Sequence, residues 1–370
     1  MRRLFRIYLE KPELAGIALL VILTLVFETR SDGVFLSAEN LRGILGLLPE
    51  VGLVSIGVTV LMICGEFDLS VGSMFALMPV SVALMTDSGV PFIPAMLLGL
   101  TIAAVVGFAN GFITLAFNIP SFITTLGMLF IVRSLTVVVT GGFPPLLSSD
   151  LPIGVFTQFV GPGGMLRASF IWFAIIALVA GAMLNGSNFG NWVRATGGFL
   201  DAAASMGVPV WWVKMTCFVM CAVLAGFAGT IEVFRLGSPL PSIGDGLELQ
   251  AVASAVIGGT ALTGGVGTVL GAIVGALLIR VIDNGLVLSQ VDANWFKFAV
   301  GGLTILAVVA NSWLQRMNSK RPRILTQARA MCSIGRANCF STARSIRLSK
   351  SSSKLRSAIR IHRGWQSVWA

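Results

Sequence analysis

The chain has 370 residues, of which 55% are hydrophobic and 11% are charged, and its mean hydropathy is +0.89. Soluble domains carry about 25% charged residues, so this composition excludes an ordinary soluble protein. The formal net charge of +10 is concentrated in residues 316–370, which hold 13 of the 26 lysine and arginine residues and no acid.

Apolar stretches long enough to cross about 30 Å of hydrocarbon recur along the chain. Because lipid cannot satisfy open backbone groups and no β-barrel alternation occurs, we expect an all-α polytopic membrane protein. We expect about ten transmembrane helices, at 14–27, 44–63, 69–85, 92–117, 122–140, 168–184, 215–234, 249–263, 266–282 and 297–313. The first stretch lacks a cleavage site, which favours an uncleaved span over a signal peptide. The eighth and ninth are short and interrupted by glycines, which is typical of broken helices near a transport pathway.

Basic residues before the first span favour a cytoplasmic N-terminus at residues 1–13. With ten spans, the segments 64–68 and 185–214 also lie on the cytoplasmic side. The long loops 141–167 and 235–248, rich in glycine and proline, then lie outside. These loops are either ordinary connectors or a docking surface for an external partner.

The sequence CGEFDLSVG at 64–72 places two acids between two apolar stretches. Its notable residues are Gly65, Glu66, Asp68, Ser70 and Gly72. A carboxylate in the middle of a bilayer costs about 2.5 kcal/mol or more, so these acids must face water, a partner or a broken helix. One interpretation is a pathway or gate element, because the glycines allow a helix break. The other is a tight cytoplasmic turn in which Asp68 or Ser70 caps the next helix.

A second candidate break lies at 257–267, where glycines are frequent. We expect its glycines to line the same pathway: Gly258, Gly259, Gly264, Gly265 and Gly267.

Two polar residues lie deep inside predicted spans. Arg133 needs a partner or a water-filled crevice, and both a structural ion pair and a substrate contact stay open. The acids considered as its partners are Glu66, Asp68 and Glu232. Asn110 stands beside small residues, which predicts a hydrogen bond between helices.

The sequence lacks the patterns of covalent and nucleotide chemistry. There is no Walker A sequence, no metal-ligand spacing, and only one histidine, His362. We therefore expect no catalytic residue, no metal and no cofactor bound by this chain, so that any ATP is used by a partner subunit.

The segment 185–214 contains the sequence DAAASMG, from Asp201 to Gly207. Good helix formers followed by Gly207 and Pro209 predict a short helix that ends in a turn. This segment is either a knob that docks on a soluble partner or an interfacial helix in an aromatic belt.

Five sequence elements, in order along the chain, resemble the ribose/xylose-type sugar permeases of ABC transporters, within the branched-chain amino-acid permease superfamily. One of them is DAAASMG, which is similar to the EAA-x3-G cytoplasmic loop: Ala202, Ala203 and Gly207 match the pattern, and Asp201 replaces its glutamate. The others are GEFDLSVGS, NIPSFITTLGMLFIVRS, IGGTALTGGVGTVLGAIVGALL and DNGL. Glu66 departs from the pattern, since glycine is usual at its position.

The resemblance implies a permease subunit of an importer for a monosaccharide or close analogue, in a bacterial inner membrane. Two copies would form the pathway, an ABC ATPase subunit would dock on the coupling loop within 185–214, and a periplasmic sugar-binding protein would deliver the substrate. The alternative is an ion-coupled secondary transporter or channel without an ATPase.

Residues 14–313 form the predicted transmembrane permease domain, and residues 314–370 form a basic tail. The tail lacks acids and periodicity, which predicts disorder unless it is bound. It is interpreted either as an out-of-frame terminus or as a segment attracted to anionic membrane lipid, at about 1 kcal/mol per basic residue. Nothing beyond its charge favours nucleic acid.

Overall fold

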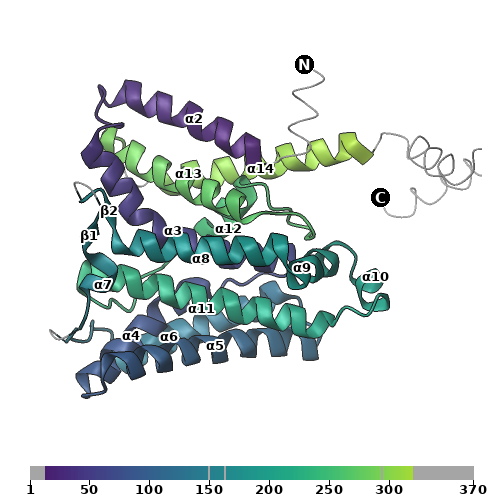
Figure 1. Cartoon of the computed structure of the whole chain (residues 1–370), viewed down its shortest axis with the longest axis horizontal. Coiled ribbons are helices and arrows are strands. Elements are labelled where there is room, and N and C mark those ends of the chain that lie inside the picture. Colours follow the sequence, from purple (N-terminus) through teal and green to yellow (C-terminus); the bar gives the residue numbers. More distant parts are fainter. Residues whose placement is uncertain (1–12, 149–150, 162–163, 293–294, 320–370) are drawn as a thin grey trace, which may run out of the picture. The chain divides into compact units, whose positions relative to one another are not determined.

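The structure is a computed structural model that describes residues 13–148, 151–161, 164–292 and 295–319. These residues form helices α2 to α14 and one small antiparallel sheet (Figure 1). The helices are α2 (Glu13–Arg30), α3 (Ala38–Ile63), α4 (Val71–Asp87), α5 (Phe92–Ala116), α6 (Ser121–Thr140), α7 (Gly154–Thr157), α8 (Ala168–Gly186), α9 (Asn188–Gly198), α10 (Leu200–Ser205), α11 (Val210–Leu236), α12 (Leu247–Ile257), α13 (Val269–Leu288) and α14 (Trp295–Ser319). Strands β1 (Phe159–Val160) and β2 (Leu166–Arg167) pair within the loop 141–167.

The prediction of an all-α polytopic membrane protein is confirmed. Of the helices in the described residues, six are long and apolar enough to cross a membrane, namely α3, α5, α6, α8, α11 and α13. The other four predicted spans coincide with α2, α4, α12 and α14. The predicted span 249–263 is wrong at its end, because α12 stops at Ile257 and turns follow.

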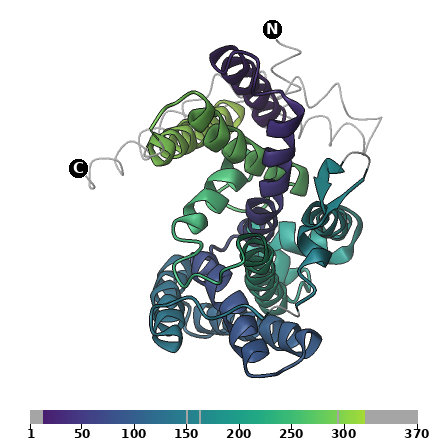
Figure 2. The same cartoon turned by 90° about the vertical axis from the view of Figure 1, so that its left-hand side faces the viewer.

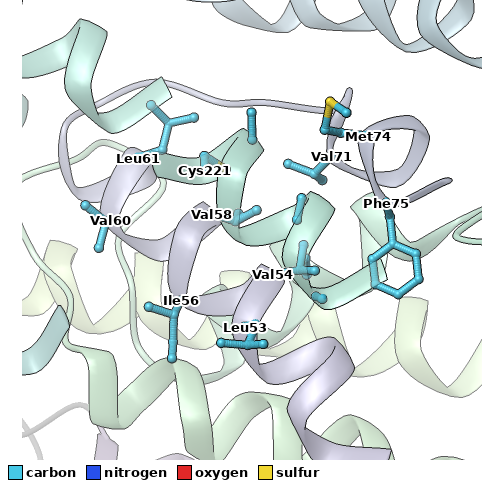
Figure 3. Packing of buried hydrophobic residues seen from close by; sticks show 14 of the residues in the cluster. Leu53, Val54, Ile56, Val58, Val60, Leu61, Val71, Met74, Phe75 and Cys221 are labelled. Atoms are coloured by element: carbon cyan, nitrogen blue, oxygen red, sulfur yellow. The ribbon is translucent and has the colours of Figure 1, made fainter. Parts of the chain in front are cut away.

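Helix α3 forms the centre of the core. Every residue from Leu48 to Ile63 is buried, which is expected of a helix that is apolar on all sides. Its neighbours include α8, α11, α12 and α13. Figure 3 shows side chains of α3, α4 and α11 together in this core, among them Val58, Phe75 and Cys221.

Helix α11 lies between two groups of helices. It packs against α3, α4 and α5, and Figure 2 shows the blue α4–α6 on one side of it and the green α13 on the other. Its glycines allow this close packing. A Cβ atom at Gly229 would overlap the Phe75 carbonyl of α4, and one at Gly226 would lie 2.6 Å from the Met78 sulfur. Small residues at such contacts let helix backbones approach closely in membranes.

Helices α5 and α6 show the opposite pattern, because they expose large apolar side chains. Examples are Ile93, Phe130 and Val138, whose exposed fractions are 70%, 64% and 72%. Exposed apolar helix faces are compatible with lipid contact, whereas water would disfavour them.

The chain divides into two compact units, residues 1–312 and 313–370. All helices up to α13 belong to the first unit. Residues 1–12 of the predicted cytoplasmic N-terminus and residues 320–370 of the predicted tail lie outside the described residues.

Candidate functional site

The predicted interruption at 64–72 is a break between α3 and α4. Gly65 has a φ of +89°, which a residue with a side chain rarely adopts. The Phe67 N–H donates to Ser121 Oγ at 3.0 Å, which attaches the break to the first residue of α6. The break is therefore held by contacts to a neighbouring helix as well as by its own turn.

Asp68 holds this turn in shape. Its Oδ1 accepts hydrogen bonds from the Ser70 N–H at 2.8 Å and the Ser70 hydroxyl at 2.6 Å. Asn110 of α5 donates to Asp68 Oδ2 at 3.2 Å and to Ser70 Oγ at 2.8 Å. The hydrogen bond predicted for Asn110 is present, but its partners lie in the break before α4 and not on another helix. Asp68 has no exposed surface, and neither Asp68 nor Ser70 caps the first N–H groups of α4 with its side chain.

The break is recessed into the helical bundle. Asn110 lies about 9 Å before the end of α5, given a rise of 1.5 Å per residue. Asp68 contacts Asn110, so it lies at a similar depth.

Glu66 forms an ion pair with Lys214, which is near the start of α11. The Lys214 Nζ and Glu66 Oε1 atoms are 2.5 Å apart, and the two side chains are only 13% and 12% exposed. No local pattern predicted that these two residues meet, because they are 148 positions apart in the chain.

The second predicted break, after α12, lies against the first. Gly259, Gly264 and Gly265 have φ values of +94°, +82° and +78°, so the chain turns here through conformations that favour glycine. The Gly265 N–H donates to the Ile63 carbonyl at the end of α3, at 2.8 Å. The two breaks are thus joined by a backbone hydrogen bond. Gly258 is buried at the start of this turn, where a Cβ atom would overlap the Gly271 carbonyl of α13.

The DAAASMG sequence forms the predicted short helix, α10, and Gly207 follows it with a φ of +82°. Asp201 and Ala202 are exposed and Ala203 is buried. Figure 1 shows α9 and α10 beyond the end of α8, on the side opposite β1 and β2. Phe199 and Met206 beside α10 are 82% and 85% exposed, which leaves apolar surface available at this end.

The end of α9 packs directly against both breaks. A Cβ atom at Gly197 would overlap the Ile63 carbonyl, and one at Gly264 would lie 2.7 Å from the Gly197 carbonyl oxygen. A Cβ atom at Gly265 would lie 2.8 Å from the Gly198 Cα atom. We call these residues the glycine junction: Ile63, Gly197, Gly198, Gly264 and Gly265. Three segments that the sequence singled out separately meet there.

Arg133 joins α6 to the loop before α12 and to the start of α4. It donates to the carbonyls of Pro241 at 2.8 Å, Ile243 at 2.9 Å and Gly72 at 3.1 Å. Its Nη2 lies 2.8 Å from Asp245 Oδ1. The three partner acids considered from the sequence were wrong; its acidic partner is Asp245. A side chain at Gly72 is disfavoured, because a Cβ atom there would lie 2.7 Å from the Gly244 carbonyl oxygen.

Sequence reasoning missed a buried ion cluster around Glu50 of α3. Its side chain is 1% exposed and lies 2.5 Å from Arg235 Nε and 3.3 Å from Arg280 Nη2. Glu232 and Asp283 flank the two arginines at 3.8 and 3.5 Å. The available signal was an acid directly after Pro49 in an apolar stretch, because such an acid requires a base on another span.

Comparison with known proteins identifies the chain. The family described as "Branched-chain amino acid transport system / permease component" matches residues 40–309. The chain belongs to this permease family.

Individual relatives agree with the family. The permease is 32% identical to the "Probable ABC transporter permease protein YphD" of Escherichia coli K12 over 312 residues, 84% of this chain and 92% of the relative. It is 34% identical to the "Ribose import permease protein RbsC" of Escherichia coli K12 over 298 residues, which is 80% of this chain and 92% of the relative. It is 33% identical to the "Autoinducer 2 import system permease protein LsrC" of Yersinia pseudotuberculosis over 308 residues, which is 80% of this chain and 83% of the relative. No solved structure matches the permease significantly.

The resemblance stated from the sequence motifs is therefore confirmed, and the permease is a membrane component rather than an enzyme. The matched region covers both helix breaks, the glycine junction and α10. Among the residues that the structure describes, no group of histidine, cysteine and acidic side chains is arranged to hold a metal ion.

Proposed function

We propose that this permease is the membrane subunit of an ABC importer and forms the pathway for a monosaccharide or a close analogue. The names of RbsC and LsrC, which refer to the import of ribose and of autoinducer 2, support this substrate class. The observation that carries the mechanism is the glycine junction, because it connects the segment around α10 to both helix breaks.

The proposed complex has further parts. An ABC ATPase subunit docks on the segment formed by Asp201, Ala202, Ala203 and Gly207, in which Ala203 is buried and the other three are exposed. That subunit uses the ATP, while this chain binds no cofactor. A periplasmic binding protein delivers the sugar from outside, and a second copy of the permease completes the pathway. The complex lies in the inner membrane of a bacterium, where the basic tail is attracted to anionic lipid.

The proposed pathway follows the helix breaks. With α2, α4, α12 and α14 added to the six long helices, about ten helices span the membrane. The first break contributes Gly65, Glu66, Asp68, Ser70 and Gly72, and the second contributes Gly258, Gly259, Gly264 and Gly265. Broken helices at bundle depth are a recurrent way to build transport sites.

Co-purification tests the ATPase partner. We would purify the tagged permease from its native membrane in mild detergent and identify bound proteins by mass spectrometry. A P-loop ATPase is expected with the wild type and is expected to be lost with Asp201→Lys and Gly207→Pro, which change the exposed docking helix and its turn.

Two substitutions on other surfaces serve as controls. Gly142→Pro matches Gly207→Pro, because Gly142 follows a helix with a φ of +83° and has open space around it. Asp87→Lys matches Asp201→Lys, since Asp87 is exposed in the last turn of α4. Both controls should retain the ATPase. A permease that purifies without an ATPase and moves solute along an ion gradient would instead support the ion-coupled alternative.

A further inference from the structure

The function proposed so far assigns Glu66 to the pathway but gives no role to its ion pair with Lys214. Both side chains are largely buried, so removal of one partner would leave the other charge desolvated and unpaired.

Glu66 and Lys214 lie in two segments that are held in place by different neighbours. Glu66 lies in the first break, where its N–H donates to the Leu61 carbonyl of α3 at 3.2 Å. The next residue, Phe67, donates to Ser121 of α6. Lys214 lies in the second turn of α11, shortly after the segment 199–209 that contains α10.

The segment 199–209 is therefore fastened to the first break at both of its ends. Its N-terminal flank is fastened by the glycine junction, where Gly197 lies against the Ile63 carbonyl. Its C-terminal flank is fastened by the ion pair from Lys214 to Glu66. A displacement of α10 that carried its two flanks along and left the break in place would separate these contacts.

We propose that Glu66 and Lys214 are positioning residues for transport, and that their ion pair makes the first helix break follow the movement of α10. This inference rests on the proposed importer function. Loss of the pair would allow α10 to move with the ATPase while the break stays behind, so that ATP is hydrolysed without sugar passage.

The test measures the amount of sugar moved per ATP hydrolysed, with the permease, its ATPase and its binding protein reconstituted in lipid vesicles. We expect Glu66→Gln and Lys214→Gln each to lower this ratio by at least about fivefold, the lower end of typical coupling between sites. The ATPase should still bind both variants, because neither residue lies on the exposed face of α10.

A charge swap separates the role of the pair from general damage. The double variant Glu66→Lys with Lys214→Glu restores the attraction in reverse, and it should recover most of the lost ratio. Asp283→Asn is the matched control, because it removes one member of the Arg280–Asp283 ion pair elsewhere in the fold and should leave the ratio unchanged.

The outcomes distinguish this inference from the function on which it rests. A wild-type chain that binds no ATPase overturns both. A wild type that couples ATP hydrolysis to uptake, with unchanged ratios in Glu66→Gln and Lys214→Gln, overturns only the inference. If the single variants fail to accumulate or to bind the ATPase and the swap does not rescue coupling, the pair is structural and the inference is wrong.

Discussion

Glu50 shows how a single charged residue is accommodated in the middle of an apolar helix. Its carboxylate is almost completely buried and is shared by Arg235 of α11 and Arg280 of α13. Because removing one partner from a buried ion pair leaves an uncompensated charge, the three residues must be considered together. They fasten α3 to the helices on two sides of it.

We expect Glu50→Gln to lower the free energy of unfolding by about 3–5 kcal/mol, because it leaves two arginines without their shared carboxylate. The measurement is the Tm of the detergent-solubilised permease, followed by fluorescence. Glu39→Gln is the control, since Glu39 is exposed in the first turn of the same helix. Equal Tm values for the two variants would show that the cluster contributes little stability.

Among the elements, the loop between α11 and α12 is positioned by a residue from α6. Four oxygen atoms from Gly72, Pro241, Ile243 and Asp245 surround the Arg133 guanidinium. A planar group with several fixed donors suits this arrangement, whereas a lysine has a single ammonium group. Arg133 thus connects the start of α4 with the start of α12, the two short helices next to the breaks.

Arg133→Lys should loosen this loop. Hydrogen bonds to charged groups contribute about 1.5–3 kcal/mol each. The loss of even one should therefore make local opening of this loop clearly more frequent. Hydrogen exchange of the amides in residues 242–247 is expected to be faster in the variant, with residues 257–267 unchanged. In Arg194→Lys, the matched control, this loop should exchange as in the wild type, because the side-chain hydrogen bonds described for Arg194 go to Leu184 and Asn185 of α8. Unchanged exchange in Arg133→Lys would mean that other contacts hold the loop.

Local features of the elements were predictable from the sequence, and long-range contacts were not. The apolar stretches located the helices, and Gly207 with Pro209 located the end of α10, because these signals act within a few residues. The end of α12 was missed because the residues after Ile257 are still partly apolar, although their glycines form turns. The partner of Arg133 depends on how the loop folds back against α6, which no local pattern encodes. Glu50 was overlooked for the same reason, since its two arginines lie far along the chain.

At the scale of the whole molecule, the glycine junction predicts which movements are transmitted. Gly197 and Gly198 are adjacent, yet only Gly197 lies against the backbone of α3. We expect Gly197→Ala to abolish most sugar uptake while ATPase binding is retained, because the added methyl group overlaps the Ile63 carbonyl and displaces α9 from the first break.

Gly198→Ala is the control for this prediction. Its Cβ atom would meet only the Gly265 Cα atom at 3.9 Å, an ordinary contact, so uptake should be close to that of the wild type. The two variants are compared by the uptake of radiolabelled sugar into whole cells, with the amount of permease in the membrane measured by immunoblot. Equal uptake by both would show that close packing at Gly197 does not matter for transport.

The enclosure of α3 has a consequence for how the bilayer acts on this permease. From Leu48 to Ile63 every residue of the helix is buried, so neighbouring helices largely shield that length from lipid. A thicker or thinner bilayer acts on the exposed faces of α5 and α6, where a mismatch in length is accommodated by tilting. Such tilting reaches α3 through α11, which packs against α3 on one side and against α4 and α5 on the other. The lipid composition of the membrane should therefore affect the first helix break indirectly, through the outer helices.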